Sequence, residues 1–315
     1  MADTLTIDQI EAAAARIHGQ VVRTPVLERT FGQVTLLIKP EGLQPTGAFK
    51  LRGALNKMAQ VGPGCPGVVA HSSGNHAQAV ARAAKMLGLP CVVVMPDNAP
   101  PLKRQRTEAD GAEVIVVGPD SDERRDRARA IAAERGFVPV EPYDDLDIAA
   151  GQGTLALELL EDAGSIDQLF APVSGGGVMA GCAVAMRARC PDAEIIAVEP
   201  DAKPALHESF VAGERVAVPP PDTIADGLRV RVPGELTWPI LRRHVDRVTL
   251  VTDAEMEDAM AWALLELRIV LEPSGATALA AAMREGRGRV GVVCTGGNAD
   301  PALLARIAAR VASGG

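Results

Sequence analysis

One lysine beside a turn is the residue of this sequence best placed for covalent chemistry. Lys50 follows Pro45, Thr46 and Gly47 and lies where a helix is predicted to begin. The positive end of a helix and partial burial both lower the pKa of an amine, which prepares it to form a Schiff base with an aldehyde. Taken alone, this spacing still favours an ordinary surface lysine.

A glycine-rich loop is the second chemical feature. Ser174, Gly175, Gly176 and Gly177 lie between a predicted strand and a predicted helix. Glycines let successive N–H groups point at one place, and a helix start adds partial positive charge, so this loop suits a phosphate. A tight turn needs fewer glycines, which favours the phosphate interpretation. The pattern G-x-x-x-x-G-K-[ST] is absent, so a nucleoside-triphosphate loop of that kind is not predicted.

Two more segments place small polar side chains beside predicted strand ends. Ser72, Ser73, Asn75 and His76 precede or begin an alanine-rich helix, where hydroxyls and free amides suit a carboxylate. Simple helix capping, and for His76 ordinary packing, are the alternatives. Thr295 follows an apolar run, at the carboxyl end of a strand, where open α/β sheets bind ligands.

Short apolar runs alternate with longer alanine-rich stretches along the chain, which predicts a parallel sheet covered on both faces and an α/β fold. Gly88, Gly111 and Gly136 each end a predicted helix. Residues 204–227, with three consecutive prolines, are predicted to be a surface loop, and residues 141–153 a domain crossing. The predicted strands are 68–70, 91–95, 114–117, 169–173, 195–198 and 290–294, and the predicted helices 77–87, 102–110, 122–134, 177–189, 254–270 and 275–283.

Composition limits the function classes. The chain has 315 residues, 47% of them apolar and 3% aromatic, which is enough for two domains with aliphatic cores. Its net charge of −8 argues against broad binding to nucleic acid or anionic membranes. Five cysteines without a C-x-x-C pair, no signal-peptide pattern and no long apolar stretch predict a cytoplasmic protein without a membrane span.

Together the motifs resemble those of one enzyme family. The segments 47–50 (GAFK), 72–75 (SSGN), 174–177 (SGGG) and 295–298 (TGGN) resemble the pyridoxal-phosphate enzymes of the tryptophan-synthase-β fold group. Within that group they are similar to the serine/threonine dehydratase and serine racemase family, nearest the serine racemase and threo-3-hydroxyaspartate dehydratase branch. The resemblance implies pyridoxal-phosphate fold type II, with two open, twisted, mostly parallel sheets flanked by helices. It also implies a large domain of residues 1–65 and 147–315 and a small inserted domain of residues 66–146.

The resemblance also implies roles for single residues. Lys50 would bind the cofactor aldehyde and move the α-proton of the substrate. Phe49 would contact the cofactor ring, Asn75 its phenolic oxygen and Thr295 its pyridine nitrogen. The phosphate would be bound by Ser174, Gly175, Gly176, Gly177 and Val178, and the substrate carboxylate by Ser72, Ser73, Asn75 and His76.

The implied reaction is dehydration and deamination of serine, threonine or 3-hydroxyaspartate to a 2-oxo acid and ammonia. A neutral threonine at the pyridine nitrogen favours quick loss of a β-hydroxyl group. Serine racemase is the alternative, because Ser73 would offer a second acid/base group on the face opposite Lys50. Arg125 would meet a second carboxylate, unless it is a surface arginine.

Several expectations stay open. Glu199 would help to bind Mg²⁺ or Ca²⁺, but Ala205 stands where the racemase-like pattern has a second acid, and Val230 replaces a serine of the animal racemases. A homodimer acting on a small amino acid is expected from the resemblance. A silent ligand-binding protein, such as a nucleotide-binding module, is the remaining alternative.

Overall fold

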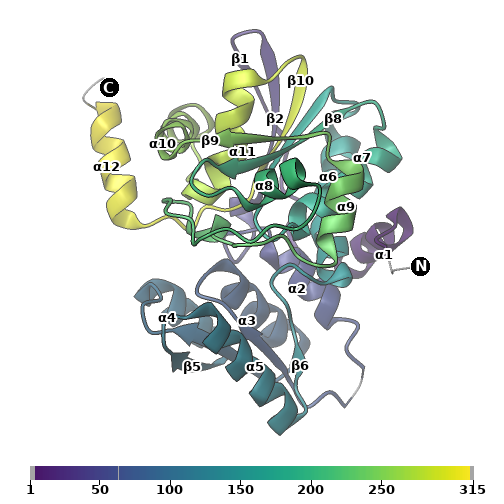
Figure 1. Cartoon of the computed structure of the whole chain (residues 1–315), viewed down its shortest axis with the longest axis vertical. Coiled ribbons are helices and arrows are strands. Elements are labelled where there is room, and N and C mark those ends of the chain that lie inside the picture. Colours follow the sequence, from purple (N-terminus) through teal and green to yellow (C-terminus); the bar gives the residue numbers. More distant parts are fainter. Residues whose placement is uncertain (1–3, 63, 313–315) are drawn as a thin grey trace.

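The computed structural model describes residues 4–62 and 64–312, which form two lobes built on separate sheets (Figure 1). In this described part, the larger sheet has six strands in the order β1-β2-β10-β7-β8-β9, and the smaller has four in the order β5-β4-β3-β6. β1 pairs with β2 in antiparallel fashion and the other neighbours are parallel. The predicted α/β fold with two mostly parallel sheets is confirmed.

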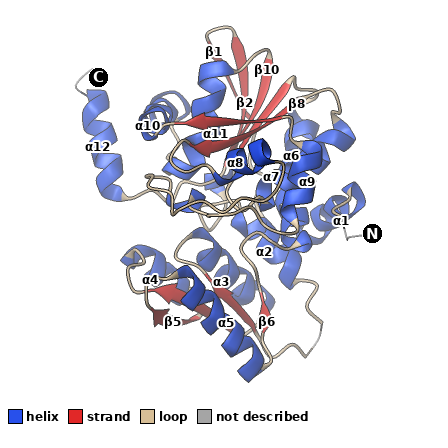
Figure 2. Ribbon diagram, viewed as in Figure 1, coloured by secondary structure: helices blue, strands red, loops and turns tan. Residues whose placement is uncertain are grey.

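Helices flank the sheet of the larger lobe (Figure 2). Its strands are β1 (Leu27–Phe31), β2 (Val34–Pro40), β7 (Gln168–Pro172), β8 (Glu194–Pro200), β9 (Arg247–Val251) and β10 (Arg289–Cys294). Its helices are α1 (Ile7–Ile17), α2 (Lys50–Met58), α6 (Leu146–Ala163), α7 (Gly177–Arg189), α8 (Ala205–Ala212), α9 (Thr237–His244), α10 (Asp253–Trp262), α11 (Pro273–Glu285) and α12 (Pro301–Ala312). Short helical turns are η1 (Glu41–Leu43), η2 (Asp226–Leu228) and the π-helical η3 (Ala263–Leu267).

The smaller lobe is made of one continuous stretch of chain. Its four strands run between residues 68 and 139, inside the predicted segment 66–146. The domain boundaries themselves stay a prediction. Its elements are β3 (Val68–His71), α3 (Asn75–Leu87), β4 (Cys91–Pro96), α4 (Pro101–Ala109), β5 (Glu113–Val117), α5 (Ser121–Arg135) and β6 (Val138–Pro139).

Glycines set the position of α2 against the larger lobe. A Cβ atom on Gly151 of α6 would lie 2.6 Å from the Cα atom of Gly53 in α2. The next helix packs as closely, since a Cβ atom on Gly181 of α7 would lie 2.2 Å from the carbonyl oxygen of Ala149 in α6. Backbone contact without side chains therefore holds these three helices together and fixes where the first residue of α2 lies.

Local signals for helix ends are confirmed where they depend on glycine. Gly88 and Gly136 adopt the left-handed conformation at the ends of α3 and α5, and Gly111 has a φ of +90°. Among the helices of residues 4–62 and 64–312, none is long and apolar enough to cross a membrane.

Two sequence predictions were wrong. Residues 204–227 are not only loop: they contain α8 and the start of η2, because the carboxylate of Glu199 accepts the N–H groups of Leu206 and His207 and so caps α8. The single helix predicted for residues 254–270 stops being regular at Trp262. A π-helical turn follows, and Arg268 ends it with a φ of +58°.

Candidate active site

Lys50 is the first residue of α2 and lies between the two lobes. Its amine donates to the carbonyl oxygen of Pro142 and lies 5.1 Å from the centre of the Phe49 ring. The N–H group of Phe49 donates to the carbonyl oxygen of Thr295 at 3.0 Å, which ties the start of α2 to the end of β10. Burial lowers the pKa of Lys50 to about 8, so a useful fraction of the amine is neutral near neutral pH.

The glycine loop forms a backbone cradle at the start of α7. Gly176 precedes the helix with a φ of +104°, a conformation that favours glycine. A Cβ atom on Gly175 would lie 2.2 Å from the ring of Tyr143, so no side chain fits there. Val178 is buried in the first turn. The first N–H groups of a helix lack partners within the helix, and this buried cradle therefore suits a phosphate group.

The single tyrosine of the chain packs against this cradle, and no sequence pattern indicated this contact. Tyr143 packs on Gly175 and follows Pro142, whose carbonyl oxygen binds Lys50. On the other side, the Thr237 hydroxyl donates to the carbonyl oxygen of Gly175 at 2.6 Å. The lysine and the cradle are thus linked through two consecutive residues.

The turn between β3 and α3 holds the predicted carboxylate-binding residues. The Ser72 hydroxyl accepts the N–H group of Gly74 at 3.1 Å, and Ser73 is exposed. The ring of His76 is buried and its Nε2 atom lies 2.9 Å from the carbonyl oxygen of Val140. Burial, together with the charge of Lys50, lowers the pKa of His76 to about 3 and keeps the ring neutral. The ring therefore serves packing of the lobe, and a carboxylate here would meet N–H groups and hydroxyls.

Glu272, which the sequence analysis missed, contacts a predicted cofactor residue. Its Oε1 atom accepts the side-chain N–H of Asn75 at 2.5 Å. The carboxyl group is buried, and burial raises its pKa to about 7. Close by, Thr295 is buried and its hydroxyl donates to the carbonyl oxygen of Ser274 at 3.2 Å. No sequence pattern could have found Glu272, because it lies 197 residues from Asn75.

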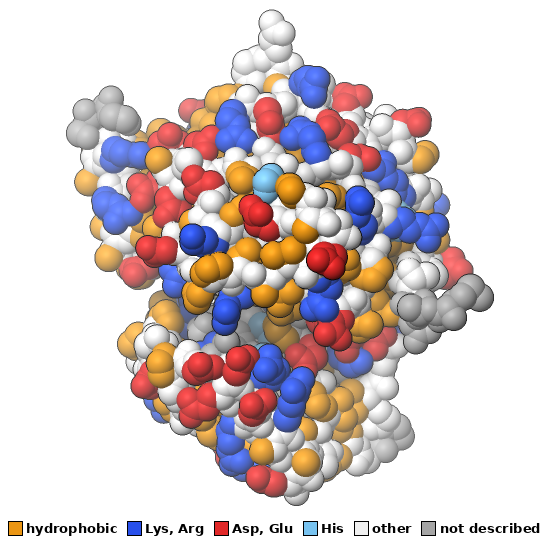
Figure 3. Space-filling view, viewed as in Figure 1, with side chains coloured by type: hydrophobic (Ala, Val, Ile, Leu, Met, Phe, Trp, Pro, Cys, Tyr) orange, Lys and Arg blue, Asp and Glu red, His pale blue; other side chains and the backbone are white. Residues whose placement is uncertain are grey.

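Cationic side chains lie on both sides of the hollow between the lobes (Figure 3). Lys103 of α4 forms an ion pair with Asp226 of η2 at 2.7 Å and so joins the lobes. Arg125 of α5 pairs with Asp122 at 3.0 Å, and its side chain is 40% exposed. Burial raises the pKa of Tyr143, and the nearby charge of Arg125 opposes this rise, so Arg125 lies within electrostatic reach of the phosphate cradle.

The residues around Glu199 do not fit a divalent metal ion. Both carboxylate oxygens of Glu199 accept backbone N–H groups of α8. In the part of the chain that the structure describes, no cluster of three or more His, Cys, Asp or Glu side chains could hold a metal. Mg²⁺ and Ca²⁺ need several oxygen ligands, so the side chains at Glu199 supply too few.

Known proteins match this chain over most of its length. A family model described as pyridoxal-phosphate dependent enzyme matches residues 17–296. The chain is 39% identical to an L-threo-3-hydroxyaspartate ammonia-lyase of Saccharomyces cerevisiae, over 94% of each chain. It is 39% identical to a serine racemase of Oryza sativa subsp. indica, covering 95% of this chain and 92% of the relative. The solved structure of maize serine racemase matches with a TM-score of 0.92 and 38% identity, over 99% of both chains.

Proposed function

This chain belongs to the family of pyridoxal-phosphate dependent enzymes, and we propose that it dehydrates and deaminates a small β-hydroxy amino acid. The β-hydroxyl group leaves as water, one water is consumed when ammonia is released, and a 2-oxo acid remains. The observation that carries the proposal is the partly buried Lys50, whose amine is linked through Pro142 and Tyr143 to a phosphate-binding cradle. Relatives named ammonia-lyases and a dehydratase support it.

The residues present fit the cofactor and divide the work. When bound, pyridoxal phosphate supplies an electron sink for the bonds of the substrate α-carbon. Lys50 binds the cofactor aldehyde, and its Nζ atom then takes the α-proton. Residues 174–178 hold the phosphate, and Thr295 offers a neutral hydroxyl to the pyridine nitrogen. The N–H groups at the start of α3 and the hydroxyls of Ser72 and Ser73 bind the substrate carboxylate.

A substrate panel tests the proposed reaction. The purified protein, incubated with pyridoxal phosphate, should release equal amounts of 2-oxo acid and ammonia from L-serine, L-threonine or L-threo-3-hydroxyaspartate. A protein that stays colourless with the cofactor and releases neither product would refute the proposal and favour a silent binding protein.

Serine racemase is the second candidate, because Ser73 is exposed in the turn before α3 and several relatives are named serine racemases. Racemisation needs an acid/base group on each face of the substrate. Replacing Ser73 with alanine should therefore abolish formation of D-serine from L-serine, whereas elimination should fall only about tenfold, which is the cost of one lost hydrogen bond to the substrate carboxylate. Chiral chromatography of D-serine beside a 2-oxo acid assay measures both. Equal losses of the two activities would reject this role for Ser73.

We propose Arg125 as the residue that binds a second carboxylate, which would favour 3-hydroxyaspartate. Replacing it with leucine removes a charge-assisted hydrogen bond, so the KM for L-threo-3-hydroxyaspartate should rise about tenfold or more while that for L-serine stays unchanged. Arg127→Leu, on the same helix but paired with Glu134, is the matched control. An equal change for both substrates would assign Arg125 a structural role.

Glu199 is not proposed to bind Mg²⁺ or Ca²⁺, because both of its carboxylate oxygens accept backbone N–H groups. We further propose that the protein is a homodimer and that it is cytoplasmic.

All five cysteines are free, which suits a reducing compartment such as the cytoplasm. Light scattering on the purified protein should give twice the chain mass of 32.8 kDa, and a monomer that retains full activity would contradict the dimer. Fractionation of the source cells should recover the protein with cytoplasmic markers, and recovery in a secreted fraction would contradict that location.

A further inference from the structure

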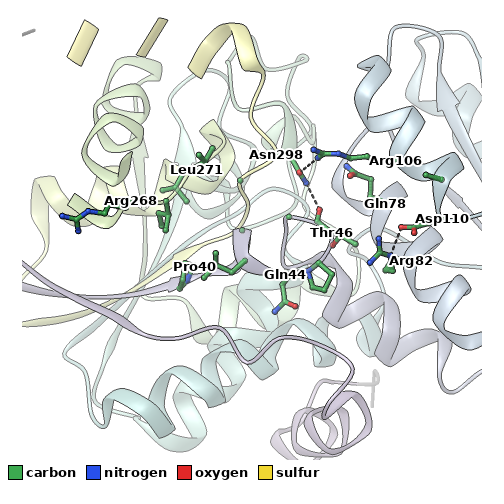
Figure 4. Close-up of a pocket in the computed structure, with 18 residues that line it drawn as sticks. Pro40, Gln44, Thr46, Gln78, Arg82, Arg106, Asp110, Arg268, Leu271 and Asn298 are labelled. Carbon is green, nitrogen blue, oxygen red and sulfur yellow. Dashed lines mark hydrogen bonds and ion pairs between the residues drawn. The ribbon is translucent and has the colours of Figure 1, made fainter. Parts of the chain in front are cut away.

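A line of hydrogen bonds crosses from one lobe to the other beside the candidate active site. Arg106 of α4 donates to the Oδ1 atom of Asn298 at 2.9 Å. The Nδ2 atom of Asn298 donates to the carbonyl oxygen of Thr46 at 2.8 Å and to the Oδ1 atom of Asn75 at 2.9 Å. Asn75 then donates to Glu272. Figure 4 shows Arg106, Asn298 and Thr46 meeting at the edge of a cavity of about 620 Å³.

The partners at the ends of this line fix which way each amide points. A guanidinium group only donates hydrogen bonds and a carbonyl oxygen only accepts them. Arg106 therefore requires the oxygen of the Asn298 amide, and Thr46 requires its NH₂ group. The NH₂ group of Asn298 is then also the donor to Asn75, which leaves Asn75 with its oxygen towards Asn298. Its own NH₂ group must face Glu272.

Backbone packing restricts the carboxyl group of Glu272, whose Oε1 atom accepts the Asn75 amide. Glu272 is buried, and a Cβ atom on Gly296 would lie 2.2 Å from its Oε1 atom, so the carboxyl group packs directly on the backbone. Asp226 and Lys103 are the charged groups that face it, and their ion pair spans the lobes. One N–H bond of the Asn75 amide goes to Glu272, and the second remains for another acceptor.

We propose that Asn298 and Glu272 are positioning residues that hold the Asn75 amide with its NH₂ group, not its oxygen, towards the phenolic oxygen of bound pyridoxal phosphate. This inference rests on the proposed function, because it requires that the cofactor binds. The phenolic oxygen carries negative charge and accepts hydrogen bonds. An amide oxygen facing it would repel it, whereas a donated N–H group would stabilise it.

The decisive change is Asn298→Asp, which keeps an acceptor for Arg106 but removes both donated bonds. The new carboxylate would repel the oxygen of the Asn75 amide and compete with Glu272 and the cofactor for its NH₂ group. We expect the dissociation constant of pyridoxal phosphate from the apoprotein to rise about tenfold or more. Titration of the apoprotein, followed by absorbance of the cofactor bound to Lys50, measures this without any turnover. Arg106→Leu, which shifts the local charge equally but keeps both donated bonds, should change the constant less than about threefold.

A second pair of variants separates orientation from charge and from folding. Glu272→Gln keeps an acceptor for Asn75 and should bind the cofactor nearly as the wild type does, whereas Glu272→Leu should weaken binding about tenfold. Thermal unfolding of each apoprotein shows whether it folds, and if Asn298→Asp does not fold, the Glu272 pair decides. The inference would be overturned if Asn298→Asp and Glu272→Leu bound pyridoxal phosphate with wild-type affinity, or if both Glu272 variants lost affinity equally. Either result would leave the proposed function standing. A wild-type apoprotein that takes up no cofactor would overturn the proposed function as well.

Discussion

Replacing Lys50 with alanine is expected to lower kcat/KM by at least about a thousandfold, because it removes the group that binds the cofactor aldehyde and moves the α-proton. The variant should also lack the absorbance of a cofactor covalently bound to lysine. Both readouts come from one preparation: an absorbance spectrum after gel filtration, and a 2-oxo acid assay. Lys85→Ala, an exposed lysine paired with Asp110, is the control and should keep both properties.

The same variant should fold at least as well as the wild type. Lys50 donates to the carbonyl oxygen of Pro142, and burial lowers its pKa from 10.5 to about 8. The unfolded chain therefore binds more protons between these pH values, so the wild-type apoprotein should gain stability as the pH rises from 8 to 10.5. Lys50→Ala should lack this rise in urea unfolding experiments. A variant that loses activity because it unfolds would not support the assigned role.

The pH dependence of cofactor uptake gives a further check on Lys50. Only the neutral amine attacks an aldehyde, so the rate at which the apoprotein takes up the cofactor should rise about tenfold per pH unit below 8 and level off above it. A rate that keeps rising to pH 10 would show that the amine has the pKa of an exposed lysine.

Replacing Arg52 with methionine is expected to destabilise the apoprotein by about 3–5 kcal/mol, because it leaves a buried carboxylate without its counter-charge. The guanidinium group is fully buried and bonds both oxygens of Glu41 and both oxygens of Glu158. Burial is the largest influence and would raise the pKa of Glu41, but the charge and the hydrogen bonds of Arg52, together with the hydrogen bond from Thr24, outweigh it and hold the pKa below its usual value. Urea unfolding of the two apoproteins measures the difference.

Two comparisons identify the cause of this loss. The double variant Arg52→Met/Glu41→Gln should be less destabilised than Arg52→Met, since residue 41 then carries no charge and Glu158 keeps its ion pair with Lys39 at 2.6 Å. The deficit of the single variant should also shrink as the pH falls towards 4.5, because Glu41 can then be buried with a proton. Arg135→Met, which removes an exposed ion pair with Glu113, should leave the unfolding midpoint unchanged. A deficit that is independent of pH would point to lost packing instead.

The position of Arg52 connects this cluster with the active site. Arg52 follows Lys50 by two residues in α2, and Glu158 lies on α6, against which α2 packs. The ion cluster therefore ties the first turn of α2 to Glu41 and to α6. In Arg52→Met, a loss of cofactor affinity that exceeds the loss in folded fraction would show that the anchor also sets the place of Lys50.

Local patterns were enough for much of the fold. Alternating apolar runs and alanine-rich stretches predicted the three helices and three of the four strands of the smaller lobe, because hydrophobic periodicity and glycine stops depend on neighbouring residues alone, but they missed the two-residue strand β6. They failed at α8 and at the π-helical turn of residues 263–267, where the deciding interactions come from elsewhere in the chain. The predicted crossing at residues 141–153 contains the start of α6, capped by Asp145.

By itself, the sequence determined which groups are available for chemistry: an amine at a helix start, glycine loops after strands and the hydroxyl of Thr295. These depend on residue type and short spacing, which the chain order preserves. Only the tertiary structure decided what each group contacts. Tyr143 against Gly175, and Glu272 against Asn75, are pairs that the strand order brings together over 32 and 197 residues. Burial in those contacts sets pKa values and amide orientations, because both depend on the solvent excluded and on the partners present after folding.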